Sequence, residues 1–276
     1  MICPNCISKS VKKIRKVFVT EEKKETFLCH CKNCDYLFLE NPSWLKIAYK
    51  NEFYGDTGYV YRNFNLVQKS LILFRIWKLL TQKKFPKACD IGAGIGLYAR
   101  LMRDNGYDFY GSDQYSEMLL IKPFINKNSK YLVKTSFEVV EHLPSFPEFL
   151  KKQIREVDLF LFSTELRKVG FIPNNDWWYY SFQLGQHIGF HSKKSLQKAF
   201  ELSGYESQKL VSYGSSIHAF ANTKAWLYSL HLSRIVWKVL SIIKFPKKII
   251  NRILFKEKSF MTSDNSYIMN LIKKNH

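Results

Sequence analysis

The chain has 276 residues, of which 46% are hydrophobic and 16% aromatic. That is enough apolar material for one α/β domain with a small appendage, which excludes a disordered protein. No apolar run approaches the ~18 residues that cross a bilayer, and no basic-then-apolar signal sequence opens the chain, so we expect a cytoplasmic protein with reduced cysteines. The net charge of +20 favours anionic partners such as nucleic acid, anionic lipid or phosphorylated substrates.

Five of the six cysteines lie within the first 34 residues. Four of them form two Cys-x2-Cys pairs: Cys3, Cys6, Cys31 and Cys34. Each pair presents two thiolates on one face, and two pairs complete a tetrahedral zinc site with a structural role. Residues 11–20 and 26–28 between the pairs predict two strands. The sequence therefore predicts a zinc ribbon over residues 1–40, with Cys29 or His30 as alternative ligands.

Residues 87–96 combine an apolar run with a glycine turn. Its glycines are spaced Gly-x-Gly-x-Gly: Gly92, Gly94 and Gly96. A helix over 97–105 and a strand over 107–111 follow, and the strand ends close to Asp113. This order predicts a nucleotide-type pocket, because glycines let the backbone approach a ligand and a carboxylate accepts ribose hydroxyls.

Asp90, immediately before the glycine turn, distinguishes two ligand classes. It would repel a dinucleotide pyrophosphate, which also favours a Gly-x-Gly-x-x-Gly spacing, but it suits the ammonium of an amino-acid moiety. The pattern resembles motif I of class I S-adenosylmethionine-dependent methyltransferases, and Asp113 resembles the ribose-binding acid of motif II. The resemblance implies that Asp90, the three glycines and Asp113 bind S-adenosylmethionine. A tight turn without a ligand is the alternative.

The segment after Asp113 is short for this family. Only residues 114–130 precede the next predicted strand, 131–135, although a complete fold would place another strand and helix here. We therefore expect the third helix or strand to be cut down.

Residues 136–142, Ser-Phe-Glu-Val-Val-Glu-His, follow the fourth strand of the fold, which ends beside the transferred methyl group in the family. On a helical turn, Glu138, Glu141 and His142 would share one face and could hold a divalent cation. The pattern resembles the Glu-x-x-Glu-His metal site of small-RNA 2′-O-methyltransferases and of ubiquinone-pathway O-methyltransferases. In the alternative there is no metal, and the histidine braces the turn.

Residues 157–164 predict a buried fifth strand, and four consecutive aromatics follow at 177–180. Four such side chains cannot all face one core, so some should line a pocket mouth or a partner surface. His187 is a candidate general base or further metal ligand, and a structural histidine is the alternative. The remaining helices and strands of this α/β segment are expected at 66–80, 193–203, 207–213 and 216–223.

Residues 224–276 break the α/β pattern and contain eleven Lys or Arg against two acids. An apolar stripe begins at Leu232, and a second follows Pro246, each opposite basic residues. Such basic amphipathic helices suit an anionic membrane surface, which we expect residues 224–258 to contact. The alternative is a helical insertion packed on the protein's own core.

Over most of residues 1–223, the order of motifs resembles bacterial methyltransferase-domain proteins of surface-polysaccharide clusters. These motifs are the cysteine pairs, Phe-Glu-x-x-Glu-His, Phe-Ser-Thr-Glu, Trp-Trp-Tyr-Tyr and Gln-His-Ile-x-Phe. The resemblance implies an α/β fold with a Rossmann-like doubly wound sheet. We expect a zinc ribbon at 1–40, a methyltransferase domain at 41–223 and a basic helical tail at 224–276.

The expected reaction is methyl transfer from S-adenosylmethionine to a hydroxyl of a sugar or of a glycan or lipid-linked precursor. Glu138, Glu141, His142 and His187 are the candidate catalytic residues. The protein would act in the cytoplasm or at the inner face of the membrane. The alternatives are C-methylation of a nucleotide sugar, nucleic-acid methylation, and an RNA-binding ribbon protein, with nucleic acid fitting less well than a small-molecule or glycan acceptor.

Overall fold

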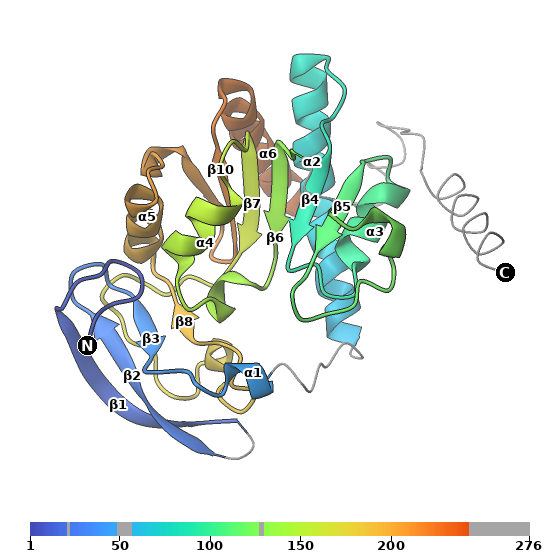
Figure 1. Cartoon of the computed structure of the whole chain (residues 1–276). Coiled ribbons are helices and arrows are strands. Elements are labelled where there is room, and N and C mark those ends of the chain that lie inside the picture. The colour runs from blue at the N-terminus through green and yellow to red at the C-terminus, as the bar shows by residue number, and fades with distance from the viewer. Residues whose placement is uncertain (21–22, 49–56, 127–129, 243–276) are drawn as a thin grey trace, which may run out of the picture. The chain divides into compact units, whose positions relative to one another are not determined.

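A computed structural model describes residues 1–20, 23–48, 57–126 and 130–242 of the chain (Figure 1). The second apolar stripe expected after Pro246 lies outside these residues, as does the rest of the tail from 243 to 276. Helices in the described part include α1 (Leu45–Ala48), α2 (Thr57–Thr81), α3 (Leu97–Asp104), α4 (Phe146–Gln153), α5 (Lys193–Leu202) and α6 (Lys224–Ile242). The short 3-10 helices are η1 (Lys122–Phe124), η2 (Val140–His142), η3 (Trp178–Tyr180) and η4 (Ser207–Lys209).

The larger sheet has six strands in the order β5-β4-β6-β7-β10-β9 (Figure 1). They are β4 (Ala88–Ile91), β5 (Phe109–Ser112), β6 (Val133–Ser136), β7 (Leu159–Ser163), β9 (Leu210–Tyr213) and β10 (Ile217–Ala221). Both β5 and β6 run parallel to β4, whereas β9 is antiparallel to β10. Because the chain order reverses on either side of β4, the sheet is doubly wound, and the expected Rossmann-like class I methyltransferase fold is confirmed.

The short segment between β5 and β6 confirms the expected truncation. In its described residues this segment forms only η1, and Gly111 pairs with Ile125 in an isolated parallel bridge. The bridge occupies the edge position next to β5, where a third strand would lie in the complete fold. A single bridged residue therefore replaces that strand.

The chain forms two compact units. The first comprises residues 1–53, 136–156 and 161–220, and the second comprises residues 54–135, 157–160 and 221–276. These units do not coincide with the boundaries expected at 40 and 223, which stay a prediction.

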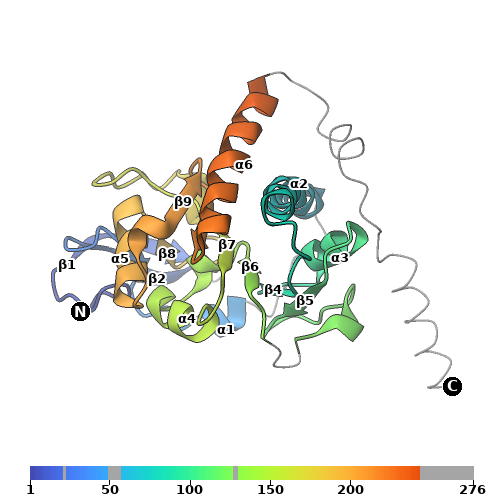
Figure 2. The ribbon, with the colours of Figure 1, turned by 90° about the horizontal axis from the view of Figure 1, so that it is seen from above.

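In the second unit, α6 packs beside α2 (Figure 2). The rings of Trp77 and Trp226 stack with their centroids 4.7 Å apart, and Phe74 meets Trp226 edge-on at 6.0 Å. This contact lies on the first turn of α6, which begins at Lys224. Trp226 is fully buried, so it is a core residue.

The first unit contains a four-stranded sheet of order β1-β2-β3-β8. Its strands are β1 (Val11–Val19), β2 (Lys24–Cys31), β3 (Leu37–Leu39) and β8 (Gly189–Phe190). Successive strands are antiparallel, and the fourth comes from a segment about 150 residues further along the chain than β3. A Cβ on Gly189 would collide with the hydroxyl of Tyr36, so the β3–β8 pairing requires glycine there.

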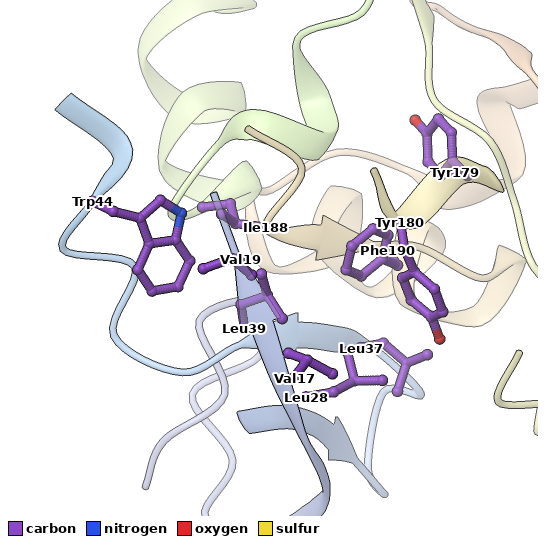
Figure 3. Packing of buried hydrophobic residues seen from close by; sticks show 10 residues of the cluster. All are labelled: Val17, Val19, Leu28, Leu37, Leu39, Trp44, Tyr179, Tyr180, Ile188 and Phe190. Carbon is purple, nitrogen blue, oxygen red and sulfur yellow. The ribbon is translucent and has the colours of Figure 1, made fainter. Parts of the chain in front are cut away.

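A hydrophobic cluster joins the ribbon strands to the segment around β8 (Figure 3). It is formed by Val17, Val19, Leu28, Leu37, Leu39, Trp44, Tyr179, Tyr180, Ile188 and Phe190. The indole N–H of Trp44 also donates to the carbonyl of Gly185 at 2.8 Å. Of the four consecutive aromatics, Tyr179 and Tyr180 are buried here, whereas Trp178 is 72% exposed, which agrees with the expectation that they cannot share one core.

Candidate functional site

The four cysteines of the Cys-x2-Cys pairs converge. Their sulfur atoms all lie within 4.8 Å of one another, with Cys3–Cys34 at 3.7 Å and Cys6–Cys31 at 3.5 Å. Zn–S bonds of ~2.3 Å at tetrahedral angles require sulfurs ~3.8 Å apart, so the spacing fits a zinc ion. The sulfur of Cys29 instead lies 3.7 Å from the carbonyl oxygen of Phe27, outside the group.

Hydrogen bonds around Cys34 favour its thiolate, whereas the hydrogen bond to Cys34 raises the pKa of Cys3 and burial raises the pKa of Cys31 to about 11. The side-chain amides of Asn5 and Asn33 each donate to a cysteine sulfur at 3.6 Å, to Cys34 and Cys6 respectively. A hydrogen bond from Cys3 lowers the pKa of Cys34 to about 5. The alternative ligand His30 is engaged elsewhere, because its Nε2 lies 2.8 Å from Oδ1 of Asp35. Neither alternative ligand therefore belongs to the cluster.

A buried ion pair holds the residue that follows the second cysteine pair. The guanidinium of Arg167 lies 3.1 Å from the Asp35 carboxylate and also donates to the Asp35 carbonyl. Asp35 itself has a φ of 63° and follows Cys34 directly. The backbone after Cys34 is thus held by Arg167, from the segment after β7.

The glycine turn of the second unit needs glycine at all three expected positions. Gly92, Gly94 and Gly96 have φ values of 72°, 54° and 87°, in the left-handed region that other residues rarely adopt. The N–H of Gly94 donates to Oδ2 of Asp113 at 2.8 Å, while Oδ1 accepts the N–H groups of Tyr115 and Ser116. The structure therefore brings the predicted motif I turn and motif II acid into direct contact.

Asp90 lies at the end of β4 and is only 3% exposed. The hydroxyl of Thr135 on the neighbouring strand β6 donates to its Oδ1 at 2.6 Å. Burial nevertheless raises the pKa of Asp90 to about 7. A buried carboxylate with a single hydrogen bond is poised to pair with a cation, and the ammonium of S-adenosylmethionine is such a group.

Two apolar residues that the sequence did not single out lie against this turn and the neighbouring strand β5. A Cβ on Gly96 would meet Ile121 at 2.4 Å, and one on Gly111 would meet Ile121 at 2.5 Å and Met118 at 2.9 Å. The N–H of Leu120 also donates to the carbonyl of Ile95. Ile121 from the shortened segment therefore lies against both the glycine turn and β5, and Met118 lies against β5.

Three of the four predicted catalytic residues converge in the first unit. Glu141, His142 and His187 each offer a ligand atom, and these atoms lie within 4.8 Å of one another. The two imidazole rings have centroids 4.9 Å apart. The expected fourth member, Glu138, is not in this group. The four-residue site predicted from the sequence is corrected to three residues.

The position of Glu138 follows from its backbone. Its φ of 56° is left-handed, so it precedes η2 without sharing a helical turn with Glu141. Its carboxylate accepts the hydroxyl of Ser163 at 2.7 Å, and its N–H donates to the same hydroxyl. Ser163 at the end of β7 thus holds Glu138 outside the converging group.

Glu141 is fully buried, and in the part of the chain that the structure describes neither carboxylate oxygen accepts a hydrogen bond of good geometry, although the Tyr179 side chain lies close enough to lower the pKa of Glu141. Burial, and secondarily the nearby charge of Glu138, raises the pKa of Glu141 well above 4.5. Burial also holds the pKa of His142 well below 6.5. A proton or a cation is needed to neutralise the carboxylate, and the neutral imidazole beside it can ligate one.

His187 is oriented by the backbone. Its Nδ1 lies 2.6 Å from the carbonyl oxygen of Tyr179, and because a carbonyl only accepts, Nδ1 carries the proton. In the neutral ring Nε2 is then the basic nitrogen, the one that can take a proton or bind a cation. A carbonyl that fixes the second imidazole nitrogen is the usual support of a metal-binding histidine.

Comparisons with known proteins identify the family. A family model described as a methyltransferase domain matches residues 64–210. No curated protein matches the sequence.

Solved structures similar to the chain include human N-acetylserotonin methyltransferase in complex with S-adenosylmethionine (TM-score 0.43, 14% identity). The match covers 57% of this chain and 52% of the human enzyme, so the chain spans about half the length of that relative. Magnesium protoporphyrin IX methyltransferase from Synechocystis PCC 6803 has a TM-score of 0.37 and 15% identity, covering 64% of this chain and 92% of that one. A methyltransferase from Thermotoga maritima has a TM-score of 0.39 and 13% identity, covering 65% and 99%.

These likenesses are too distant to assign a residue or a substrate. The family model, in contrast, spans more than half of the 276 residues and includes the glycine turn, Asp113 and His187. The chain therefore belongs to the methyltransferase-domain family.

Proposed function

We propose that the protein transfers a methyl group from S-adenosylmethionine to a hydroxyl of a sugar or of a glycan or lipid-linked precursor. The observation that carries this proposal is the group formed by the buried Glu141 and the half-buried His142 and His187, which can accept the hydroxyl proton or bind a cation that lowers the hydroxyl pKa. A hydroxyl needs such help, because it is a weak nucleophile when protonated.

In the proposed reaction the acceptor oxygen attacks the methyl carbon in line with the bond from carbon to sulfur. The carbon–sulfur bond breaks and its electron pair stays on sulfur, which leaves S-adenosylhomocysteine. The hydroxyl proton passes to Nε2 of His187 when no cation is bound there, and to solvent when a cation occupies that nitrogen and lowers the hydroxyl pKa. In the second unit, Asp90 would pair with the ammonium of the cofactor and Asp113 would accept its ribose hydroxyls.

We further propose a divalent cation at Glu141, His142 and His187. Two imidazoles and one carboxylate favour a transition ion such as Mn²⁺, Co²⁺ or Zn²⁺ over Mg²⁺ or Ca²⁺. When bound, such an ion supplies a Lewis acid to the acceptor hydroxyl. Its binding would neutralise the buried Glu141 carboxylate and release the proton held there, so affinity for the ion should increase with pH.

For the four-cysteine cluster we propose a structural zinc ion. Four thiolates leave no open position for chemistry, and a ribbon this small has too little core to fold unaided. Protein purified without chelator should contain one equivalent of zinc at this cluster. Cys34→Ser should lose it, whereas Cys29→Ser should retain it. Release of zinc by Cys29→Ser alone would show that the ligand set is wrong.

The function is tested with S-adenosylmethionine labelled in its methyl group and a panel of acceptors. The panel comprises nucleotide sugars, lipid-linked sugars, free oligosaccharides and transfer RNA, and the product is analysed by NMR. A methyl group on oxygen of a sugar supports the proposal. A methyl group on carbon would establish C-methylation, with His187 removing a carbon-bound proton, and labelled RNA would establish nucleic-acid methylation. Either result would overturn the proposed acceptor.

A further inference from the structure

The outward face of α6 carries an apolar stripe. Its exposed members are Tyr228, Leu232, Ile235, Val236 and Val239. Spacings of three and four residues place them on one side of the helix. Ile235 is 60% exposed and Val239 is 46% exposed, whereas Trp226, Leu230 and Ser233 on the other side are buried. The helix is therefore apolar on both faces, and only one face is used by the core.

Lys224 and Lys238 lie beside this stripe, because they are four residues from Tyr228 and three from Ile235. Arg234 lies further round the helix, all three cations are exposed, and α6 contains no Asp or Glu. Across residues 224–258 the sequence has nine Lys or Arg against Glu257. An apolar stripe edged by cations complements a surface that is both apolar and anionic.

We propose that this face of α6 docks in the plane of an anionic lipid membrane. Tyr228, Leu232, Ile235 and Val239 would enter the boundary between headgroups and acyl chains, and the flanking cations would contact lipid phosphates. Among the residues that the structure describes, no helix combines the length and apolar character needed to cross a bilayer. The contact is therefore peripheral.

Charge favours lipid over the other occupants of this face. A second copy docking α6 against α6 would bring the cations of one helix beside those of the other. Residues 243–258 carry six Lys or Arg against one acid, so packing them on the stripe would also place like charges together. Nucleic acid would match the cations but would leave the apolar stripe in water. An anionic lipid surface satisfies both components.

The test is sedimentation of the full chain with vesicles, which requires neither cofactor nor acceptor and so stands apart from the proposed reaction. We expect binding to vesicles of equal parts phosphatidylglycerol and phosphatidylcholine, weaker binding to pure phosphatidylcholine, and release by salt. Ile235→Asp with Val239→Asp should reduce binding about tenfold or more. Val169→Asp, at a valine 50% exposed outside α6, is the matched control and should bind as the wild type does.

Arg234→Gln with Lys238→Gln tests the cations without touching the stripe, and it keeps the proposal testable if the aspartate variant does not fold. We expect this variant to lose the preference for phosphatidylglycerol. Equal binding of both vesicle types by the wild type, or unchanged binding by both variants, would overturn the proposal. So would a dimer that the Ile235→Asp and Val239→Asp changes dissociate in the absence of vesicle binding, which would show a second copy on this face. Binding to RNA with none to vesicles would also overturn it.

Discussion

Replacement of Asp90 by asparagine should stabilise the protein while weakening its binding of S-adenosylmethionine. Burial raises the pKa of Asp90 from 3.8 to about 7. At ~1.4 kcal/mol per pKa unit, ionising this carboxylate in the folded protein costs on the order of 4 kcal/mol more than in the unfolded chain. Asparagine keeps the acceptor for the Thr135 hydroxyl but carries no charge, so it avoids this cost.

The sign and pH window follow from proton linkage. Between pH 3.8 and about 7 the unfolded chain has lost the Asp90 proton and the folded chain still holds it. Wild-type stability therefore falls as pH rises through this window and levels off above pH 7. The advantage of Asp90→Asn should grow by roughly 2–3 kcal/mol between about pH 5 and pH 8.

Urea unfolding at several pH values measures this difference, with Asp176→Asn, at an exposed acid, as the control. Calorimetry with S-adenosylhomocysteine measures the second half of the prediction. In the wild type, binding near pH 7 should release a proton from Asp90, and Asp90→Asn should bind more weakly without that release. A variant that is less stable at every pH, or that binds the ligand as tightly as the wild type, would refute the role given to this carboxylate.

Three further substitutions probe the two sites. Asp113→Ala should weaken S-adenosylhomocysteine binding by roughly 1–3 kcal/mol in calorimetry, since it removes charge-assisted hydrogen bonds, and Asp176→Ala should not. His187→Asn should lower the affinity for Mn²⁺ in a metal-titration assay while leaving S-adenosylhomocysteine binding intact; equal Mn²⁺ affinity would argue against a cation there. Gly189→Ala should also weaken Mn²⁺ binding, because its Cβ meets the Tyr36 hydroxyl. Adding Tyr36→Phe should restore part of the loss, and no recovery would point to a different cause.

The cofactor turn could be predicted from the sequence because its determinants are local. Left-handed backbone at Gly92, Gly94 and Gly96 selects glycine directly, and the acid that contacts the turn comes from the next strand. The same holds for the cysteine pairs, whose spacing brings two sulfurs together before any tertiary contact forms. A site whose residues lie within one or two neighbouring elements can therefore be predicted from the sequence.

The error at Glu138 shows where local periodicity fails. Spacings of three and four residues bring side chains together only if every residue between them is helical, and Glu138 is left-handed. Its partner, Ser163, is 25 residues away, so the pairing that displaces it from the cluster depends on how β7 is placed. Likewise, the carbonyl of Tyr179 that orients His187 gives no pattern in the sequence, because any residue has a carbonyl.

The ribbon and the histidine site form one continuous structure, although the sequence suggested separate modules. Phe38 on β3 pairs with Gly189, and the N–H of Leu39 donates to the carbonyl of Ile188. The N–H of Ile188 donates in turn to the carbonyl of Glu141 at 2.9 Å. His187 is therefore held between a strand of the ribbon on one side and Glu141 on the other. If the four cysteines no longer clustered, β3 would no longer be held in place. The segment before β8 would then lose the strand partner that keeps His187 beside Glu141. The N-terminal cysteines thus support the geometry of the candidate catalytic group from over 100 residues away.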